Sequence, residues 1–521
     1  MAGARASLTV SPDVTAGEEL TIAGTGFSRG ATVMFRWDGA RAGWIRQVET
    51  NNNGAFEKTV TVPVRIRAGD HTLAAEEVRR NRQGERRVVR RATIELAVAR
   101  STAFDSARVN PDPRERATPS PTPSPTPSPS AAPTTAPTTA PTVAPTVAPT
   151  VAPPPSVPPA VGVAGYGAGA KGGAGGQVIT VTNLNDAGSG SLRAALESSG
   201  PRTVVFAVGG TINLGSDLRI TDPFLTVDGS TAPKPVVVRG GMLLVVSHDV
   251  ILRHLRFRPG DDVGAPADVD AVSLNGLQGA TYNVVLDHLT MIWGPDIGGL
   301  SILGNVHDTT VQYSIMGEGL FLSRHPEAAA SQDGHSMAAN IVQMTANGAW
   351  PERITFHHNL FTTSHSRMPR IQGAECVDLV NNVIYNWGQW AVSGNPRALN
   401  IVNNWFRAGP EMLTTNAYAW QKQADLPNPF PGSVYHAGNA ADGFTYAVEA
   451  PGGVLRSSAA CGGLSVNAES AQAAYNTVVG AAGATLPVRD AIDQRIISNV
   501  LNRSGTFFNG GGQSAPNPYY P

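Results

Sequence analysis

The stretches VDLVNNVIY (residues 377–385) and LNIVNNWFR (residues 399–407) repeat one pattern, in which apolar residues flank a pair of asparagines. The earlier stretches VILRHLRFR, VVLDHLTMI, TVQYSIMGE and ITFHHNLFT fit the same frame. Aligned by eye, the six place one polar residue at a common position: His254, His288, Ser314, Asn359, Asn382 and Asn404. The last two steps are 23 and 22 residues long, and the earlier steps are longer and uneven.

A repeat of this length, built from strands and turns with no helix, is typical of a parallel β-helix. Each coil would stack on its neighbour, and the shared polar position would form a hydrogen-bonded ladder along the axis. We therefore interpret His288, Asn382 and Asn404 as structural residues. The longer steps predict loops that project from one face, where repeat proteins commonly bind ligands.

Working outward, a Pro-, Ser-, Thr- and Ala-rich segment separates this region from the N-terminus. Its repeats lack the bulky apolar side chains that a folded core needs, so residues 101–160 are predicted to be a disordered tether. Residues 161–521 would form the β-helix domain. The short alternating strands of residues 1–100, divided by Gly, Asp and Asn turns, predict a β-sandwich of about seven strands. AGTGFSRGATVMFRWDG within it resembles bacterial immunoglobulin-like modules, so we expect an accessory domain.

The 521-residue composition narrows the function classes. Lys+Arg number 39 and Asp+Glu 40, which does not favour a nucleic-acid partner. No apolar run reaches the roughly 18 residues of a membrane span. The start MAGARASLTV has no apolar signal core, so we expect any secretory signal to have been removed or never to have existed. Cys376 and Cys461 could form one disulfide, and the sequence leaves that pairing open.

Residues 354–387, ITFHHNLFTTSHSRMPRIQGAECVDLVNNVIYNW, carry the strongest functional signal. They read as two apolar strands, ITFHHNLF and VDLVNNVIYNW, joined by a polar connection that holds Arg367, Pro369 and Arg370. Two other loops are rich in carboxylates, and such loops suit a hard cation such as calcium. Their members are Asp261, Asp262, Asp268, Asp270 and Asp296.

Seven motifs in order resemble the pectate lyases of polysaccharide lyase family 1, from about residue 165 to residue 410 and, more weakly, beyond. They are DGSTAP, VILRHLRFRPGD, DAVSL, VVLDHLTMIWGPD, VQYSIMGEGL, HHNLF with SRMPRI, and VDLVNNVIYNWG. The resemblance implies an all-β fold, a right-handed parallel β-helix preceded by the small sandwich. It also implies calcium-dependent β-elimination of polygalacturonate, the de-esterified form of pectin.

Carried over residue by residue, the resemblance makes Arg367, which opens the Arg-x-Pro motif, the catalytic base. Arginine is normally protonated, so burial and nearby cations would have to lower its pKa, and a role in holding the substrate carboxylate is the alternative. The implied substrate-binding residues are Arg370, His365, Gln372 and His335, and the implied calcium ligands are Asp270, Asp296 and Asp268.

Three positions depart from the family pattern. Gln372 stands where many relatives have a second arginine, and Ile297 stands where an acidic residue often follows the WGxD aspartate. A lysine expected in the coil near MGEGLFLSRH is absent, and the candidates to replace it are Arg324, His325 and His335.

The sequence also leaves two other functions open. A β-helix polygalacturonase would need paired carboxylates around the bond, for which Asp268 and Asp270 are the candidates. A polysaccharide-binding adhesin would need no catalytic group at all. The favoured hypothesis is a secreted, monomeric pectate lyase that acts on pectin, with attachment to the cell surface left open.

Overall fold

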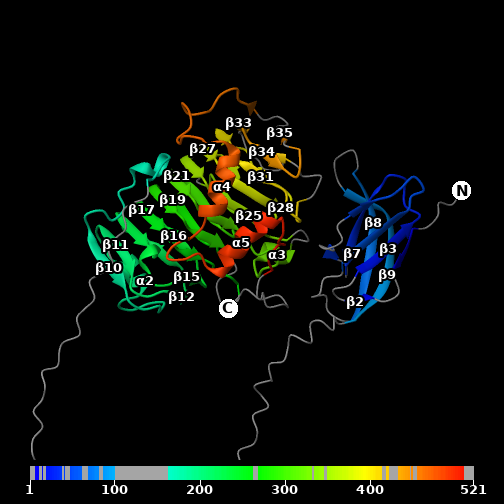
Figure 1. Ribbon diagram of the computed structural model, residues 1–521, viewed down its shortest axis with the longest axis horizontal. Helices are drawn as coiled ribbons and strands as arrows, with labels where there is room; N and C mark the ends of the chain where they lie inside the picture. Colours follow the sequence, from blue (N-terminus) through cyan, green and yellow to red (C-terminus); the bar gives the residue numbers. More distant parts are fainter. Residues whose placement is uncertain are drawn as a thin grey trace, which may run out of the picture. The chain divides into compact units, whose positions relative to one another are not determined.

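The computed structural model describes residues 6–99 and 162–509, apart from short segments at 11–13, 16–18, 38–39, 42–46, 62–68, 81–85, 262–267, 331–333, 345–348, 413–417, 422–431, 446 and 450–453. The chain divides into two compact units, residues 1–152 and 153–521 (Figure 1). The predicted tether, residues 101–160, lies outside the described residues.

The N-terminal unit contains two β-sheets. One is the antiparallel sheet of β1 (Ser7–Val10), β3 (Glu19–Thr25) and β7 (Phe56–Thr61). The other runs in the order β2 (Val14–Thr15), β9 (Arg86–Ala99), β8 (Gly69–Arg80), β4 (Thr32–Trp37) and β5 (Ala40–Arg41), and β6 (Gln47–Glu49) also pairs with β4. Leu20, Ile22, Phe35 and Leu73 pack into one buried core. The sandwich is thus confirmed, with nine described strands rather than about seven because several are very short. Its immunoglobulin-like identity stays a prediction.

The C-terminal unit is a parallel β-helix with three sheets. The helix-covered sheet contains β12 (Gly210–Asn213), β15 (Val236–Arg239), β18 (Arg256–Phe257), β20 (Thr290–Ile292), β22 (Ile315–Gly317), β25 (Leu360–Ser364), β28 (Val383–Trp387), β31 (Trp405–Arg407) and β34 (Ala440–Asp442). Every strand pairs in parallel with the strand of the next coil. The predicted fold class is therefore confirmed.

The remaining strands form two further sheets. We call them the pocket sheet and the disulfide sheet, after the pocket and the disulfide bond described below. The pocket sheet contains β13 (Leu218–Ile220), β16 (Leu243–Val245), the first part of β19 (Val272–Asp287), the first part of β21 (Leu300–Gln312), β23 (Ala339–Val342), β26 (Arg370–Gln372), β29 (Val392–Ser393), β32 (Tyr418–Gln421) and β35 (Ala447–Glu449). The disulfide sheet contains β10 (Gln177–Val181), β11 (Arg202–Phe206), β14 (Leu225–Asp228), β17 (His248–Arg253), the last parts of β19 and β21, β24 (Glu352–His357), β27 (Glu375–Val380), β30 (Leu399–Val402), β33 (Ser433–Ala437) and β36 (Val454–Leu455). β19 and β21 run from one sheet onto the other.

The two strands expected in residues 354–387 are each divided by a sharp bend. ITFHHNLF forms β24 and β25, and VDLVNNVIYNW forms β27 and β28. His358 and Asn381 lie at these bends with φ of 55° and 58°. The left-handed conformation turns the chain from the disulfide sheet onto the helix-covered sheet. An apolar pattern continues across such a bend, so the sequence alone did not show it.

The expected polar ladder is present, but two of its six predicted members, His254 and His288, do not belong to it. Asn382 Oδ1 accepts from the Asn359 N–H at 3.0 Å, Asn404 Oδ1 from the Asn382 N–H at 2.8 Å, and Asn439 Oδ1 from the Asn404 N–H at 2.8 Å. Ser314 continues the ladder, since its N–H donates to Asn359 Oδ1 at 2.9 Å.

His254 and His288 do not belong to that ladder. The strand register places Leu255 and Leu289 at the asparagine position, one residue later. The two histidine rings instead stack on each other at 4.8 Å, in a column that continues through Tyr313 to His358. Aligning the segments by polarity misplaced these two by one residue, and a one-residue slip moves a side chain to a different direction.

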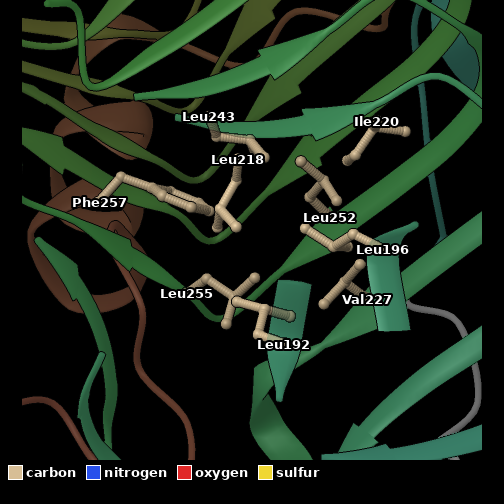
Figure 2. A pocket seen from close by; sticks show the side chains of 9 residues that line it. All are labelled: Leu192, Leu196, Leu218, Ile220, Val227, Leu243, Leu252, Leu255 and Phe257. Atoms are coloured by element: carbon tan, nitrogen blue, oxygen red, sulfur yellow. The ribbon is translucent and has the colours of Figure 1, made fainter. Parts of the chain in front are cut away.

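The interior of the β-helix is a packed apolar core. Near its N-terminal end, nine apolar side chains surround a cavity of about 10 Å³, which holds at most about one water molecule (Figure 2). α2 (Leu192–Leu196) contributes Leu192 and Leu196 to this lining, and Ser191 caps the helix by accepting the Ala194 N–H at 3.2 Å. This cavity is therefore too small to hold a sugar.

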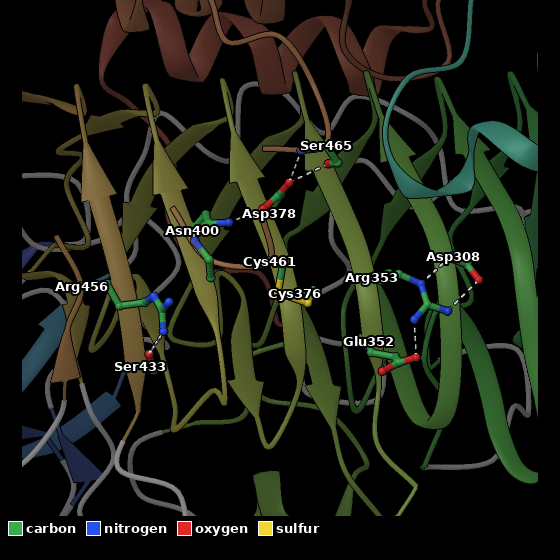
Figure 3. The surroundings of a disulfide bond; sticks show 11 residues. Asp308, Glu352, Arg353, Cys376, Asp378, Asn400, Ser433, Arg456, Cys461 and Ser465 are labelled. Carbon is green, nitrogen blue, oxygen red and sulfur yellow. Dashed lines mark hydrogen bonds and ion pairs between the residues drawn. A yellow bond between two sulfur atoms is a disulfide. The ribbon is translucent and has the colours of Figure 1, made fainter. Parts of the chain in front are cut away.

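The C-terminal segment fastens onto the outside of two sheets. Cys376 and Cys461 form a disulfide, which answers the open question about their pairing. Beside it, Asp378 accepts hydrogen bonds from the Ser465 N–H at 2.7 Å and from Asn400 Nδ2 at 2.7 Å (Figure 3). These contacts hold residues near 461–465 on the disulfide sheet.

Two helices, α4 (Ala471–Ala481) and α5 (Ala491–Asn502), lie across the helix-covered sheet (Figure 1). Their apolar residues Val478, Ile496 and Val500 are buried in a cluster with side chains of that sheet. α5 is the longest helix of the described residues at 12 residues, too short to cross a bilayer, and no other described helix could do so.

Candidate functional site

An open pocket of about 240 Å³ lies on the outer side of the pocket sheet. Its walls come from consecutive coils, before β23, around the turn into β26, and before β29. The lining residues are Glu327, Gly334, His335, Met337, His365, Ser366, Arg367, Arg370, Gln389 and Trp390. Most of them are polar, and the pocket lies beside the carboxylate loops that the sequence singled out.

The turn that carries Arg367 is held between neighbouring coils. The Ala339 N–H donates to the Arg367 carbonyl at 2.8 Å, and the Met368 N–H donates to the Ala391 carbonyl at 2.9 Å. The Ser393 N–H donates to the Pro369 carbonyl at 3.1 Å. These backbone bonds to both adjacent coils position Arg367 and Arg370, so both guanidiniums project from a rigid part of the fold.

The two pocket arginines have no anionic partner of their own. Within the described residues, neither the Arg367 nor the Arg370 side chain makes a hydrogen bond or an ion pair, and Arg370 Nε is buried without a partner. Burial lowers the pKa of Arg367, which the charges of Asp296, Glu327 and Asp270 partly oppose. Burial, with the neighbouring charge of Arg367, lowers the pKa of Arg370 to about 10. A partly buried pair of cations without counterions is suited to receive an anion.

A cluster of imidazoles and carboxylates adjoins the arginines. Asp296 Oδ1 lies 3.6 Å from His335 Nε2 and 4.0 Å from His325 Nε2. Glu327, on α3 (Pro326–Ala330), accepts a hydrogen bond from His335 Nε2 at 3.0 Å. The two rings stack with centroids 4.3 Å apart. Asp268 Oδ1 is 3.7 Å from His325 Nε2, and its side chain is 81% exposed.

The buried carboxylates of this cluster carry raised pKa values. Burial, and then the charges of Asp296 and Asp268, raise the pKa of Asp270 to about 7. Burial also raises the pKa of Asp296, although His335, His325 and Arg367 oppose this. A divalent cation beside these oxygens would supply the missing positive charge.

The donor set fits a hard divalent cation held by carboxylates. Asp268, Asp270 and Asp296 offer oxygen atoms, the ligands that calcium prefers. His325 is poorly placed to serve as a ligand, because its Nδ1 accepts the Glu327 N–H at 3.2 Å. With that lone pair in use, the proton of the neutral ring lies on Nε2, the atom that faces Asp268 and Asp296. The three aspartates are candidate ligands by their oxygen chemistry, whereas the donor atoms that lie within 4.8 Å of one another in the described residues are those of Asp296, His325 and His335.

The structure brings most of the predicted site residues together. Arg367, Arg370, His365 and His335 line one pocket, and Asp296 lies within 3.6 Å of His335. Asp270 lies behind Asp296, where its Oδ1 accepts the Ile297 N–H at 3.1 Å, and Asp268 is close to His325.

Gln372 is the one predicted substrate-binding residue that is not part of the pocket lining. Its side-chain oxygen accepts the Asn395 N–H at 3.3 Å, which ties it to the next coil. In contrast, Glu327, Gln389 and Trp390 line the pocket and were not identified from the sequence. Trp390 stands in the WGQW stretch directly after a repeat segment, and that position was the only available signal.

Comparison with known proteins finds similar fungal sequences. Fungal proteins named "Probable pectate lyase C" from Aspergillus fumigatus and Aspergillus terreus are 33% and 34% identical to the chain over 251 and 252 residues. The matches cover 47% of this chain and 53% of each relative, so the chain spans about half the length of the curated relatives it matches. No protein-family model matches the chain.

Solved structures with a similar chain course include the cedar-pollen allergen Jun a 1, at 18% identity and a TM-score of 0.48. A pectate lyase bound to a hexasaccharide is 15% identical, with a TM-score of 0.44. Each match covers 62% of this chain, and 93% and 96% of the respective structures.

Proposed function

We propose that the protein is a pectate lyase that cleaves de-esterified homogalacturonan by calcium-dependent β-elimination and releases unsaturated oligogalacturonides. One observation carries the proposal. Within the described residues, Arg367 and Arg370 face an open pocket and make no ion pair, and they lie beside Asp270 and Asp296, whose pKa values burial raises. A uronate polymer matches both the arginine pair and the aspartates. Its carboxylate suits the guanidiniums and can share a cation with the aspartates. The similarity to fungal pectate lyases supports the same conclusion.

The proposed mechanism assigns a separate task to each arginine. Arg370 holds the uronate carboxylate through its forked N–H groups. Arg367 acts at C5, where the adjacent carboxylate makes the hydrogen weakly acidic. The lowered pKa of Arg367 favours a base role, because it increases the fraction of neutral guanidine that can accept a proton.

The electrons of the C5–H bond then form the C4=C5 double bond. The C4–O bond breaks, and the departing oxygen takes a proton. A calcium ion held by Asp268, Asp270 and Asp296 would stabilise negative charge on the uronate carboxylate.

The arrangement of Asp268 and Asp270 does not favour a hydrolase. Hydrolysis requires two carboxyl groups that flank the scissile bond. The Asp268 side chain is 81% exposed, whereas Asp270 is 8% exposed and bonded to the Ile297 N–H. The two carboxylates thus occupy different environments, and the backbone hydrogen bond of Asp270 occupies one of its oxygens.

The test is incubation of the full chain with polygalacturonate, with calcium or with a chelator, and a matched Arg367→Ala variant. We expect ultraviolet-absorbing unsaturated products that require both calcium and Arg367. New reducing ends without this absorbance would indicate the hydrolase instead. Binding of the polymer without any turnover in the parent protein would indicate an adhesin.

We further propose that the enzyme is secreted and monomeric, and that the N-terminal sandwich is an accessory module on a flexible tether.

A further inference from the structure

The wall of the pocket opposite the carboxylate cluster contains a tryptophan. Trp390 lies two residues before β29 (Val392–Ser393), whose Ser393 pairs with Arg370 of β26. The Met368 N–H donates to the Ala391 carbonyl, so the backbone at Trp390 lies one coil beyond that of Arg367. Trp390 and Arg367 line the same pocket.

Trp390 differs from the other tryptophans described in the β-helix unit. Three are buried in the fold, at no more than 1% exposure: Trp293, Trp387 and Trp420. Trp405 packs on Tyr475, and Trp350 lies under the guanidinium of Arg397, 3.7 Å from the ring centroid. Trp390 is partly exposed and, within the described part of the chain, contacts no other aromatic ring and no cation and makes no side-chain hydrogen bond. Its indole face and N–H are therefore available to a ligand.

The order of the coils defines a direction for the bound polymer. The sheet pairs β21, β23, β26 and β29 in sequence, and these strands follow Asp296, His335, Arg367 and Trp390 in turn. Strands in a sheet are about 4.8 Å apart, so three steps place Trp390 about 14 Å along the axis from the level of Asp296. The arginines lie between these two ends.

We propose that Trp390 stacks on the galacturonate unit next to the one held by Arg367 and Arg370, on the side away from the aspartates. The inference rests on the proposed function. A galacturonate ring has a carboxylate at one edge and a face of C–H groups, and the electron-rich face of an indole attracts such C–H groups. The guanidiniums would bind the charge of one unit and Trp390 the apolar face of the next. Trp390 would thus determine the minimum length of a good substrate.

The test compares the parent, Trp390→Ala, Trp390→Phe and Trp350→Ala on oligogalacturonates of increasing length. Trp350→Ala is the matched control, because Trp350 is a partly exposed tryptophan that does not line the pocket. We expect Trp390→Ala to raise KM about tenfold on long oligomers, with kcat changed less, and to remove the gain in affinity with chain length. Trp390→Phe should keep most of that gain, and Trp350→Ala should leave KM within about twofold.

Equal KM values for the parent and Trp390→Ala at every chain length would overturn the inference while leaving the lyase proposal intact. If the parent forms no unsaturated product, the lyase proposal fails and a binding measurement decides the inference. Tryptophan fluorescence of the parent should then change on titration with oligogalacturonate, and Trp390→Phe should abolish the change. A change that persists in Trp390→Phe, or no change in the parent, would overturn it.

Discussion

The β-helix holds two pairs of arginines in opposite ways. Arg258, on the helix-covered sheet, is 2% exposed and bonds Asp490 at 2.7 Å and Asp493 at 2.7 Å. Burial alone would lower its pKa, but the charges of Asp493 and Asp490 outweigh burial and raise it. Arg256 beside it lies 3.2 Å from Asp490, but there burial outweighs the charges of Asp493 and Asp490 and lowers the pKa. In the turn before β26 of the pocket sheet, Arg367 makes no ion pair within the described residues, and burial lowers its pKa.

The difference separates a structural use of arginine from a functional one. A buried guanidinium whose counterions come from its own chain fastens a segment, here α5 and the turn before it. A guanidinium that faces a pocket without a counterion leaves the anion to be supplied by a ligand. The following predictions test this division.

Arg367→Ala should produce the largest change. Removal of the proposed base from the reacting centre should lower kcat by about 10³-fold, measured from the appearance of unsaturated product. The midpoint of thermal unfolding should not fall, since the side chain makes no ion pair with any residue that the structure describes. A marked loss of stability would show that Arg367 has a structural role.

Arg258→Ala should produce the opposite result. It leaves Asp493 buried without its partner, which should lower the free energy of unfolding by about 3–5 kcal/mol. Urea unfolding measures this loss. At low temperature, kcat and KM on polygalacturonate should match the parent, and a large change in kcat for the folded variant would contradict the division.

Arg370→Lys should produce a smaller change, in substrate binding. Lysine keeps the charge but loses the forked geometry, and one charged hydrogen bond contributes about 2 kcal/mol, so kcat/KM should fall roughly 30-fold. Steady-state kinetics at fixed calcium measure it. Unchanged kcat/KM would show that Arg370 does not grip the carboxylate.

A buried histidine that is hydrogen-bonded within the fold predicts the smallest effect, a change in stability per unit of pH. His357, on the disulfide sheet, is buried with Nε2 3.1 Å from Gln312 Oε1, and burial lowers its pKa to about 3. The neutral form is favoured in the folded state, so its contribution is complete above pH 6.5 and is lost as the pH falls towards 3. Unfolding free energy should decrease by up to about 1.4 kcal/mol per pH unit below 6.5. His357→Gln should reduce this slope, and an unchanged slope would contradict the assignment.

The sequence predicted much of this molecule because its signals are local and repeated. Alternating apolar residues around Asn359, Asn382 and Asn404 identify the coils, since every coil must bury the same face. The SRMPRI turn identified Arg367 and Arg370, because charged residues in a short strand connection have few structural reasons to be there.

Other features depend on contacts between distant segments. The one-residue displacement of His254 and His288 was decided by strand register, which polarity alone does not determine. The pairing of Arg258 with Asp493 joins residues 235 positions apart. Glu327 reaches the pocket because α3 lies beside His335, and neither residue type nor spacing indicated this.

By itself, the sequence determined the β-helix, the separate sandwich, and the turn that carries the two arginines, because hydrophobic periodicity and turn chemistry act over a few residues. Only the tertiary structure decided which buried charges are paired and which remain available to a ligand. Pairing depends on which coil lies beside which and on which segment covers each sheet. These are properties of packing between residues far apart in the chain, and they distinguish Arg258 from Arg367.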